Sequence, residues 1–285
     1  MDISAVQRIE DPRQRAVRIN ELIDEQQAVM SELTRLRREA IEDMQRFGIS
    51  QSEIAKLLGM TRSRVSQILA GSGRKPERAL LSGGDSVTIV VPVEKAPYPE
   101  GKERPVVHHE DTEFTERITQ LARSVGLDVE TEYAGQGDFI DLNRDGLVIT
   151  CGPRQSPWLE QALSADHTYG FARDEEGWYL EDKVAGTKYR SPEDAGEPRD
   201  YGYLGTLPRP DGNGFWLYAA GIHAAGSRGA AKYLADNLAA LYKANKNTLW
   251  SCLVACTFDP DTRELTKAEL LADVQRRGAI PTARK

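Results

Sequence analysis

Apolar residues near the start of the chain recur in steps of three and four, which is the spacing of one helix face. Pro12 suits the first position of a helix, and Gly48 suits the position just beyond its end. The pattern predicts one amphipathic helix of about 36 residues, roughly 54 Å long. Its apolar stripe comprises Ile19, Ile23, Val29, Met30, Leu33, Leu36, Ala40, Met44 and Phe47, with Gln26 as a polar interruption.

A stripe of this length is too long for a short neighbouring motif to cover. It packs either on the body of the same chain or on a second copy, and a long regular stripe favours the second copy. We therefore expect a homodimer.

Two short helices are predicted next. Ser50 and Glu53 have the spacing of a capping box, in which the two side chains satisfy free N–H groups at a helix start. Gly59 supplies a left-handed turn, and Thr61 caps a second helix that ends near Gly71. The two helices are expected to pack through Ile54, Ala55 and Leu58 on one side and Val65, Ile68 and Leu69 on the other.

The segment QSEIAKLLGMTRSRVSQIL resembles the helix-turn-helix of bacterial transcriptional regulators and of the promoter-reading region of sigma factors. Ala55, Gly59, Val65 and Ile68 stand at the small, turn and packing positions of that pattern. The resemblance covers about twenty of the 285 residues. It implies that the second helix enters the major groove of double-stranded DNA, with an exposed face of Thr61, Arg62, Ser63, Arg64, Ser66 and Gln67.

Arg62 and Arg64 are the first candidates for base contacts, because a guanidinium can bond bidentately to guanine. Arg74, Lys75 and Arg78 follow the helix and are expected to contact backbone phosphates. The chain has a net charge of -7, yet residues 54–78 hold six basic side chains and one acidic side chain. Salt confines an electrostatic field to roughly 10 Å, so the acidic remainder does not exclude a nucleic acid partner.

A stretch rich in Gly, Ser, Pro and charge follows the second short helix and is typical of a linker. It divides the chain into a DNA-binding part at residues 1–70, a linker at 71–85 and a larger domain at 86–285. Strand, loop, helix and strand then alternate along residues 147–258, which predicts a mainly parallel sheet with helices on its faces. The stretch APYPEGKERPVV is expected to be irregular. The expected fold class is thus α + α/β, with a Rossmann-like second domain.

In its order of elements and its glycine loops, the second domain loosely resembles the Rossmann-like nucleotide-sensing domains of bacterial signalling proteins, including the SLOG group. Loops at the carboxyl ends of parallel strands bind ligands, and helix starts attract phosphate. A nucleotide-like or otherwise phosphorylated ligand is therefore one interpretation, and glycines that serve only the turn geometry are the other. The candidate ligand residues are Gly152, Arg154, Ser156, Gly221, His223, Gly226, Ser227, Arg228 and Gly229.

The sequence assigns no catalytic residue, metal ligand or obligatory cofactor. His223 has no evident acidic partner, and Cys151, Cys252 and Cys256 read as buried thiols rather than as a zinc site. An odd number of cysteines and the lack of an apolar run of about eighteen residues favour a reduced, cytoplasmic location and no membrane partner.

Three functional hypotheses follow. The leading one is a transcriptional regulator whose second domain senses a small ligand. The others are a nucleotide- or nucleoside-processing enzyme with a DNA-binding autoregulatory segment, and a helix-mediated scaffold without a ligand.

Overall fold

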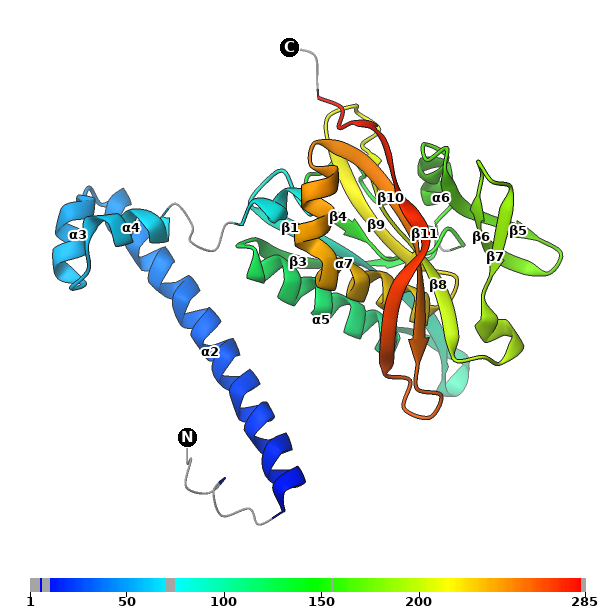
Figure 1. The fold of residues 1–285 in the computed structure, drawn as a ribbon, viewed down its shortest axis with the longest axis horizontal. Coiled ribbons are helices and arrows are strands. Elements are labelled where there is room, and N and C mark those ends of the chain that lie inside the picture. The colour runs from blue at the N-terminus through cyan, green and yellow to red at the C-terminus, as the bar shows by residue number, and fades with distance from the viewer. Residues whose placement is uncertain (1–5, 7–10, 70–74, 155, 283–285) are drawn as a thin grey trace. The chain divides into compact units, whose positions relative to one another are not determined.

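The computed structural model describes residue 6 and residues 11–69, 75–154 and 156–282 (Figure 1). The chain forms two compact units, residues 1–73 and residues 74–285. Each unit has its own apolar core.

Within residues 11–69 the first unit forms the helices α2 (Pro12–Arg46), α3 (Gln51–Leu57) and α4 (Arg62–Leu69). The long helix that the apolar repeat predicts is present as α2, and Asp11 caps it by accepting a hydrogen bond from the Arg13 backbone N–H at 2.9 Å. The predicted capping box is also present. The Ser50 backbone N–H donates to the Glu53 carboxylate at 2.9 Å, and the Glu53 N–H donates to Ser50 Oγ at 3.3 Å.

A small core joins the end of α2 to the two short helices. Gly59 turns the chain between α3 and α4 with a φ of 64°, a conformation that glycine adopts without steric cost. Leu58 was expected in this core, but that expectation is wrong, because its side chain is 37% exposed. The core consists of Ile41, Ile54, Ala55, Val65 and Ile68, with Met44, Met60 and Leu69 packed against it.

The second unit is built on a sheet of eight strands in the order β3-β1-β4-β9-β8-β10-β11, with β2 paired to the far half of β1. A second sheet has the order β5-β6-β7. The strands are β1 (Ser86–Tyr98), β2 (Lys102–Val106), β3 (Asp128–Gly135), β4 (Leu147–Ile149), β5 (Tyr169–Asp174), β6 (Gly177–Asp182), β7 (Thr187–Arg190), β8 (Arg199–Pro208), β9 (Phe215–Gly221), β10 (Thr248–Phe258) and β11 (Leu265–Ala279).

The expectation of a mainly parallel sheet is wrong. The pairs β3–β1, β1–β4 and β4–β9 are parallel, while the pairs β1–β2, β9–β8, β8–β10 and β10–β11 are antiparallel. The reason is the length of the connections. Residues 209–214 join β8 to β9, and residues 259–264 join β10 to β11; such short links can close only antiparallel pairs.

The Pro-rich stretch after residue 95 is regular rather than irregular, which also corrects the expectation. It forms the hairpin of β1 and β2 around the short helix η2 (Pro99–Gly101). Pro97 and Pro105 are tolerated because the hairpin lies at the edge of the sheet, where a missing N–H breaks no ladder.

Helices cover the large sheet on both faces (Figure 1). One face packs against α5 (His109–Ser124) and α7 (Ala224–Asn245), and the other against α6 (Pro157–Leu163) and the small sheet. Trp250 and Trp216 are fully buried on the two faces respectively.

The second unit begins earlier than residue 86. The short helix η1 (Pro76–Leu80) brings Leu80 and Leu81 into the core beneath α7. Residues 75–85 of the expected linker therefore belong to this unit, and residues 71–74 lie outside the described residues.

Candidate functional sites

The first candidate site is the exposed face of α4. Thr61 Oγ1 caps the helix by accepting a hydrogen bond from the Arg64 backbone N–H at 3.1 Å. Val65 and Ile68 hold the opposite face in the core of the first unit. This arrangement leaves a hydroxyl- and guanidinium-bearing surface in solvent, made of Thr61, Arg62, Ser63, Arg64 and Ser66.

The other predicted DNA-contacting residues, Gln67, Arg74, Lys75 and Arg78, are not part of this surface as the structure describes it. The side chain of Gln67 and the whole of Arg74 lie outside the described residues. Lys75 is exposed at the start of the second unit. Arg78 is engaged within that unit, where its guanidinium lies 2.6 Å from the Asp85 carboxylate and also donates to the Gly84 carbonyl.

The apolar stripe of α2 is open to solvent over much of its length. Ile19 is 42% exposed, Met30 60%, Leu33 54% and Leu36 46%. Near the end of α2, by contrast, Ile41 is fully buried in the core of the helix-turn-helix. The exposed part of the stripe is thus an apolar surface with no partner among the described residues.

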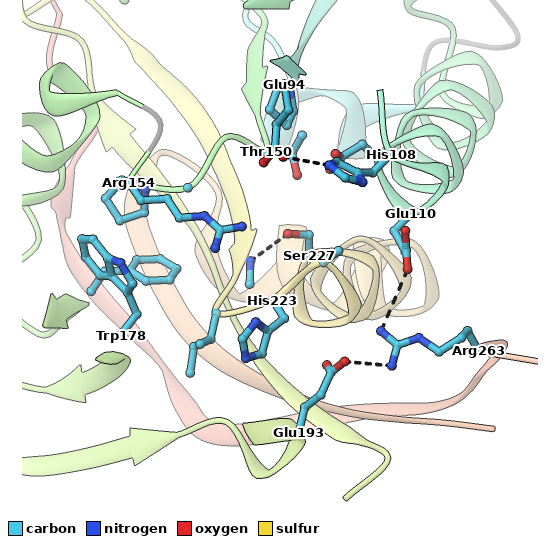
Figure 2. Close-up of a pocket in the computed structure, with 18 residues that line it drawn as sticks. Glu94, His108, Glu110, Thr150, Arg154, Trp178, Glu193, His223, Ser227 and Arg263 are labelled. Atoms are coloured by element: carbon cyan, nitrogen blue, oxygen red, sulfur yellow. Dashed lines mark hydrogen bonds and ion pairs between the residues drawn. The ribbon is translucent and has the colours of Figure 1, made fainter. Parts of the chain in front are cut away.

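The second candidate site is a cavity of about 320 Å³ in the second unit (Figure 2). It opens where β4 and β9 end and α7 begins, which is where ligands bind in open α/β sheets. The lining residues are Pro92, Glu94, His108, Glu110, Asp111, Thr150, Gly152, Pro153, Arg154, Phe171, Trp178, Glu193, Gly221, Ile222, His223, Ala224, Ser227 and Arg263.

Five of the nine predicted ligand residues meet in this cavity, namely Gly152, Arg154, Gly221, His223 and Ser227. Ser156 is buried nearby in sequence but does not line it, and its hydroxyl has no partner among the described residues. Gly226, Arg228 and Gly229 do not line it either.

The second glycine loop is shorter than the sequence suggests, because α7 already begins at Ala224. Gly226 and Gly229 lie within the helix and serve packing. A Cβ on Gly226 would collide with the Tyr201 carbonyl oxygen, and a Cβ on Gly229 would collide with Cys256. Arg228 is buried and pairs with Glu113 and the Arg263 carbonyl, so it ties α7 to α5.

A buried carboxylate occupies the start of α7. Asp200 Oδ2 accepts hydrogen bonds from the backbone N–H groups of His223 at 3.0 Å and Gly226 at 2.7 Å, and Oδ1 accepts from the Ser191 hydroxyl at 2.6 Å. Burial raises the pKa of Asp200, and the hydrogen bond from Ser191 opposes that rise. The helix terminus that would attract a phosphate therefore already holds an internal anion.

Most charged groups around the cavity are paired. His108 Nε2 lies 3.0 Å from the Glu94 carboxylate, and this contact raises the pKa of His108. Arg263 lies 2.8 Å from the Glu193 carboxylate and 3.9 Å from that of Glu110. Figure 2 shows Arg263 bridging the two glutamates.

His223 also has an acidic partner that the sequence does not reveal. Its Nε2 lies 2.8 Å from the Asp194 carboxylate, which is supplied by η3 (Pro192–Ala195). The two residues are 29 positions apart in the chain. They meet because η3, which directly precedes β8, lies beside the start of α7.

Three groups in the cavity remain without such partners. The Arg154 guanidinium reaches into the cavity (Figure 2) and forms no ion pair with any described residue. Thr150 is 3% exposed, and its hydroxyl has no hydrogen-bond partner in the described part of the chain. Asp111 is 7% exposed, and burial raises the pKa of its carboxyl from 3.8 to about 6. Sequence reasoning missed Thr150 and Asp111, because neither belongs to a motif.

The three cysteines are buried and are not reactive groups of the candidate sites. All three thiols are free and buried. Burial raises the pKa of Cys151 to about 12 and that of Cys256 to about 12, so neither supplies a thiolate nucleophile at neutral pH. The residues that the structure describes contain no group of three or more His, Cys, Asp or Glu side chains placed to hold a metal ion.

Comparison with known proteins identifies one region of the chain. Residues 42–82 match a family model described as a helix-turn-helix, which supports a DNA-binding regulator of the bacterial helix-turn-helix kind. No curated protein and no solved structure matches the chain. Within the described part of the chain, none of the helices has the length and apolar character needed to cross a membrane.

Proposed function

We propose that this chain is a transcriptional regulator that acts as a homodimer, binds duplex DNA through α4 and responds to a small ligand in the cavity of its second unit. The observation that carries the proposal is the polar face of α4. This face lies opposite a closed apolar core, within the segment that matches the helix-turn-helix family.

The side chains on this face have the chemistry that DNA recognition requires. Arg62 and Arg64 can donate bidentately to guanine edges, and Thr61, Ser63 and Ser66 can bond to phosphates or bases. The capping hydrogen bond to Thr61 Oγ1 fixes the first turn of α4, where recognition helices present residues to the bases.

The exposed stripe on α2 supports the homodimer. Leu33 and Leu36 would each be removed from water if two α2 helices paired, and burying a large apolar side chain contributes about 1.5–3 kcal/mol. In such a dimer the two α4 helices would read two half-sites about 10 base pairs, or a multiple of that, apart.

The cavity supports the ligand response. A ligand that binds one arrangement of the two helix-turn-helix units more tightly shifts the population toward it. The sequence favours a nucleotide-like or phosphorylated ligand because of the two glycine loops. Asp200 weakens that interpretation, since its carboxylate satisfies N–H groups at the start of α7.

The test of DNA binding uses the full chain. A preferred duplex is selected from a random pool, and fluorescence anisotropy then compares that duplex with a scrambled one. We expect the R62A/R64A variant to lose the preference, because each lost bidentate contact costs about 1–3 kcal/mol of discrimination.

The matched control is R123A/K243A, which removes the same charge from exposed positions on α5 and α7. It should keep the preference, while its overall affinity changes little. An unchanged preference in R62A/R64A, or an equal loss in both variants, would refute the assignment of α4 as the reading helix.

A second candidate function is a nucleotide- or nucleoside-processing enzyme. It is favoured by the pairing of His223 with Asp194 beside Ser227, because a histidine oriented by a carboxylate can act as a general base. Incubating the full chain with a panel of nucleotides and nucleosides distinguishes the two functions. Turnover that disappears in H223A would establish the enzyme, and binding without product would establish the sensor.

A further inference from the structure

We propose that the cavity of the second unit binds a small zwitterion, a molecule that carries one carboxylate and one protonated amine on an apolar body, and that it excludes nucleotide phosphates. This inference rests on the proposed function in one respect only, namely that the ligand of the cavity is the one the regulator senses. It starts from three groups of the cavity wall. Arg154 and Asp111 form no ion pair within 4 Å with any described residue, and the buried hydroxyl of Thr150 has no hydrogen-bond partner in the described part of the chain.

Arg154 defines the anion-binding end of the cavity. Its guanidinium points into the open space between Trp178 and Ser227 (Figure 2). A guanidinium binds a carboxylate through two parallel hydrogen bonds. Ser227 Oγ accepts from the Gly221 backbone N–H at 2.8 Å, which leaves its own hydrogen to donate to the same anion.

Asp111 defines the cation-binding end. It lies in the first turn of α5, is buried, and lines the cavity, and no ion pair joins its carboxylate to a described residue. A buried carboxylate without a partner is unfavourable, and a ligand ammonium would remove that penalty. Thr150 lines the same cavity, and its buried hydroxyl can accept from an ammonium or donate to a carboxylate.

The remaining charged side chains of the wall that face the cavity are already engaged in ion pairs with one another. Glu94 is paired with His108, and Arg263 is shared between Glu110 and Glu193. The unpaired groups that a ligand meets are therefore one cation, Arg154, and one carboxylate, Asp111.

The balance of charge in the cavity wall disfavours a nucleotide phosphate. Such a ligand brings two or more negative charges into a wall that holds four carboxylates and only two guanidiniums. Like charges at such distances disfavour binding. The start of α7 offers less compensation than a free helix terminus, because Asp200 already accepts from two backbone N–H groups there, those of His223 and Gly226.

The volume of the cavity and its aromatic wall indicate the size of the ligand and the nature of its uncharged part. A volume of about 320 Å³ lies at the small end of the range of roughly 300–1,000 Å³ for ligand pockets. Trp178 lies beside Arg154 (Figure 2), and Phe171 adds a second aromatic side chain to the wall. An α-amino acid with an apolar or aromatic side chain has this size and this pair of charges.

The test is calorimetric titration of the full chain with the twenty standard L-amino acids. For any amino acid that binds, the two analogues that lack one charge are titrated as well; for L-phenylalanine these are 3-phenylpropionate and 2-phenylethylamine. We expect at least one apolar or aromatic amino acid to bind, each analogue to bind about tenfold more weakly or worse, and AMP and ATP not to bind.

Two variants locate the binding. R154Q and D111N should each weaken the binding of that amino acid about tenfold or more. The matched controls R123Q and D128N change exposed residues of the same unit and should leave it unchanged. Circular dichroism of each variant verifies that the fold is intact.

The proposal is overturned if no amino acid binds, if AMP or ATP binds instead, or if R154Q and D111N bind as the unchanged chain does. These failures are distinguishable from failure of the regulator proposal. If R62A/R64A loses its DNA preference while no amino acid binds, the regulator stands and the ligand inference falls. If amino acids bind while no duplex is preferred, the ligand inference stands and the regulator proposal falls.

Discussion

Replacing Asp111 by Asn should stabilise the second unit at neutral pH. The side chain keeps its size but can no longer ionise. Burial is the largest cause of the raised pKa of Asp111. Glu110 and Glu94 raise it further, and His108 and Arg154 lower it. The structure thus places a carboxylate where its charged form is unfavourable.

The magnitude follows from the pKa. A value of about 6 in the folded state against 3.8 corresponds to about 3 kcal/mol, at about 1.4 kcal/mol for each pH unit. This is an upper estimate, because solvent in the cavity screens the charge. Between about pH 4 and pH 6 the folded chain keeps a proton that the unfolded chain has released, so wild-type stability falls as pH rises through this window.

The variant has no such dependence at position 111. Its advantage over wild type should therefore be absent below about pH 4, grow between pH 4 and pH 6, and level off at up to about 3 kcal/mol above pH 6. His108 titrates in both wild type and variant, and because Asp111 contributes to its raised pKa, a smaller change in the titration of His108 accompanies the substitution.

Urea denaturation at several pH values measures this difference. All four tryptophans lie between residues 158 and 250, so intrinsic fluorescence reports on the second unit alone. D128N, at an exposed position, should show no comparable gain. A D111N variant no more stable than wild type at pH 8, or one with the same advantage at pH 4 and pH 8, would refute the reasoning. If D111N is more stable and also binds the ligand more weakly, Asp111 lowers the stability of the folded chain but is needed for ligand binding.

Three further predictions test other parts of the account. D200A should destabilise the second unit by about 3–5 kcal/mol because it leaves buried donors unpaired, whereas D200N, which can still accept, should cost about 1 kcal/mol; equal losses in urea denaturation would contradict the assigned hydrogen bonds. G226A should cost about 1–3 kcal/mol through its collision with Tyr201, and unchanged unfolding would show that the helix and strand can separate freely there. L33S/L36S should convert a dimer into a monomer in light scattering, and a mass that remains at two chains would exclude α2 as the interface.

Local signals in the sequence are sufficient to predict the first unit. The three- and four-residue apolar repeat, the Ser50 and Glu53 pair and Gly59 each act within a few residues, and the structure contains the helices and turns that they predict. Leu58 is the exception. It falls at the end of α3, where the helix turns it out of the core.

The second unit was less predictable, because strand direction depends on pairing between distant segments. The alternation along residues 147–258 predicts strands, among them residues 248–258, which form β10. Nothing local indicates that β10 runs antiparallel to β8. No local pattern marks β8 or β11 as strands, and the elements that are recognisable from the sequence alternate as in a parallel sheet.

Only part of the candidate cavity could be predicted for the same reason. Arg154, His223 and Ser227 were found because they follow strands in glycine loops. Asp111 and Thr150 carry no motif, and they become notable only when the fold buries them without a partner. The sequence alone gives no sign of that burial.

The claim that α4 reads duplex DNA is tested most directly by hydroxyl-radical footprinting of the full chain on its selected duplex. The account predicts two protected stretches centred about 10 base pairs, or a multiple of that, apart, both of which disappear in R62A/R64A. Absence of protection at any chain concentration, or protection that R62A/R64A leaves unchanged, would contradict it.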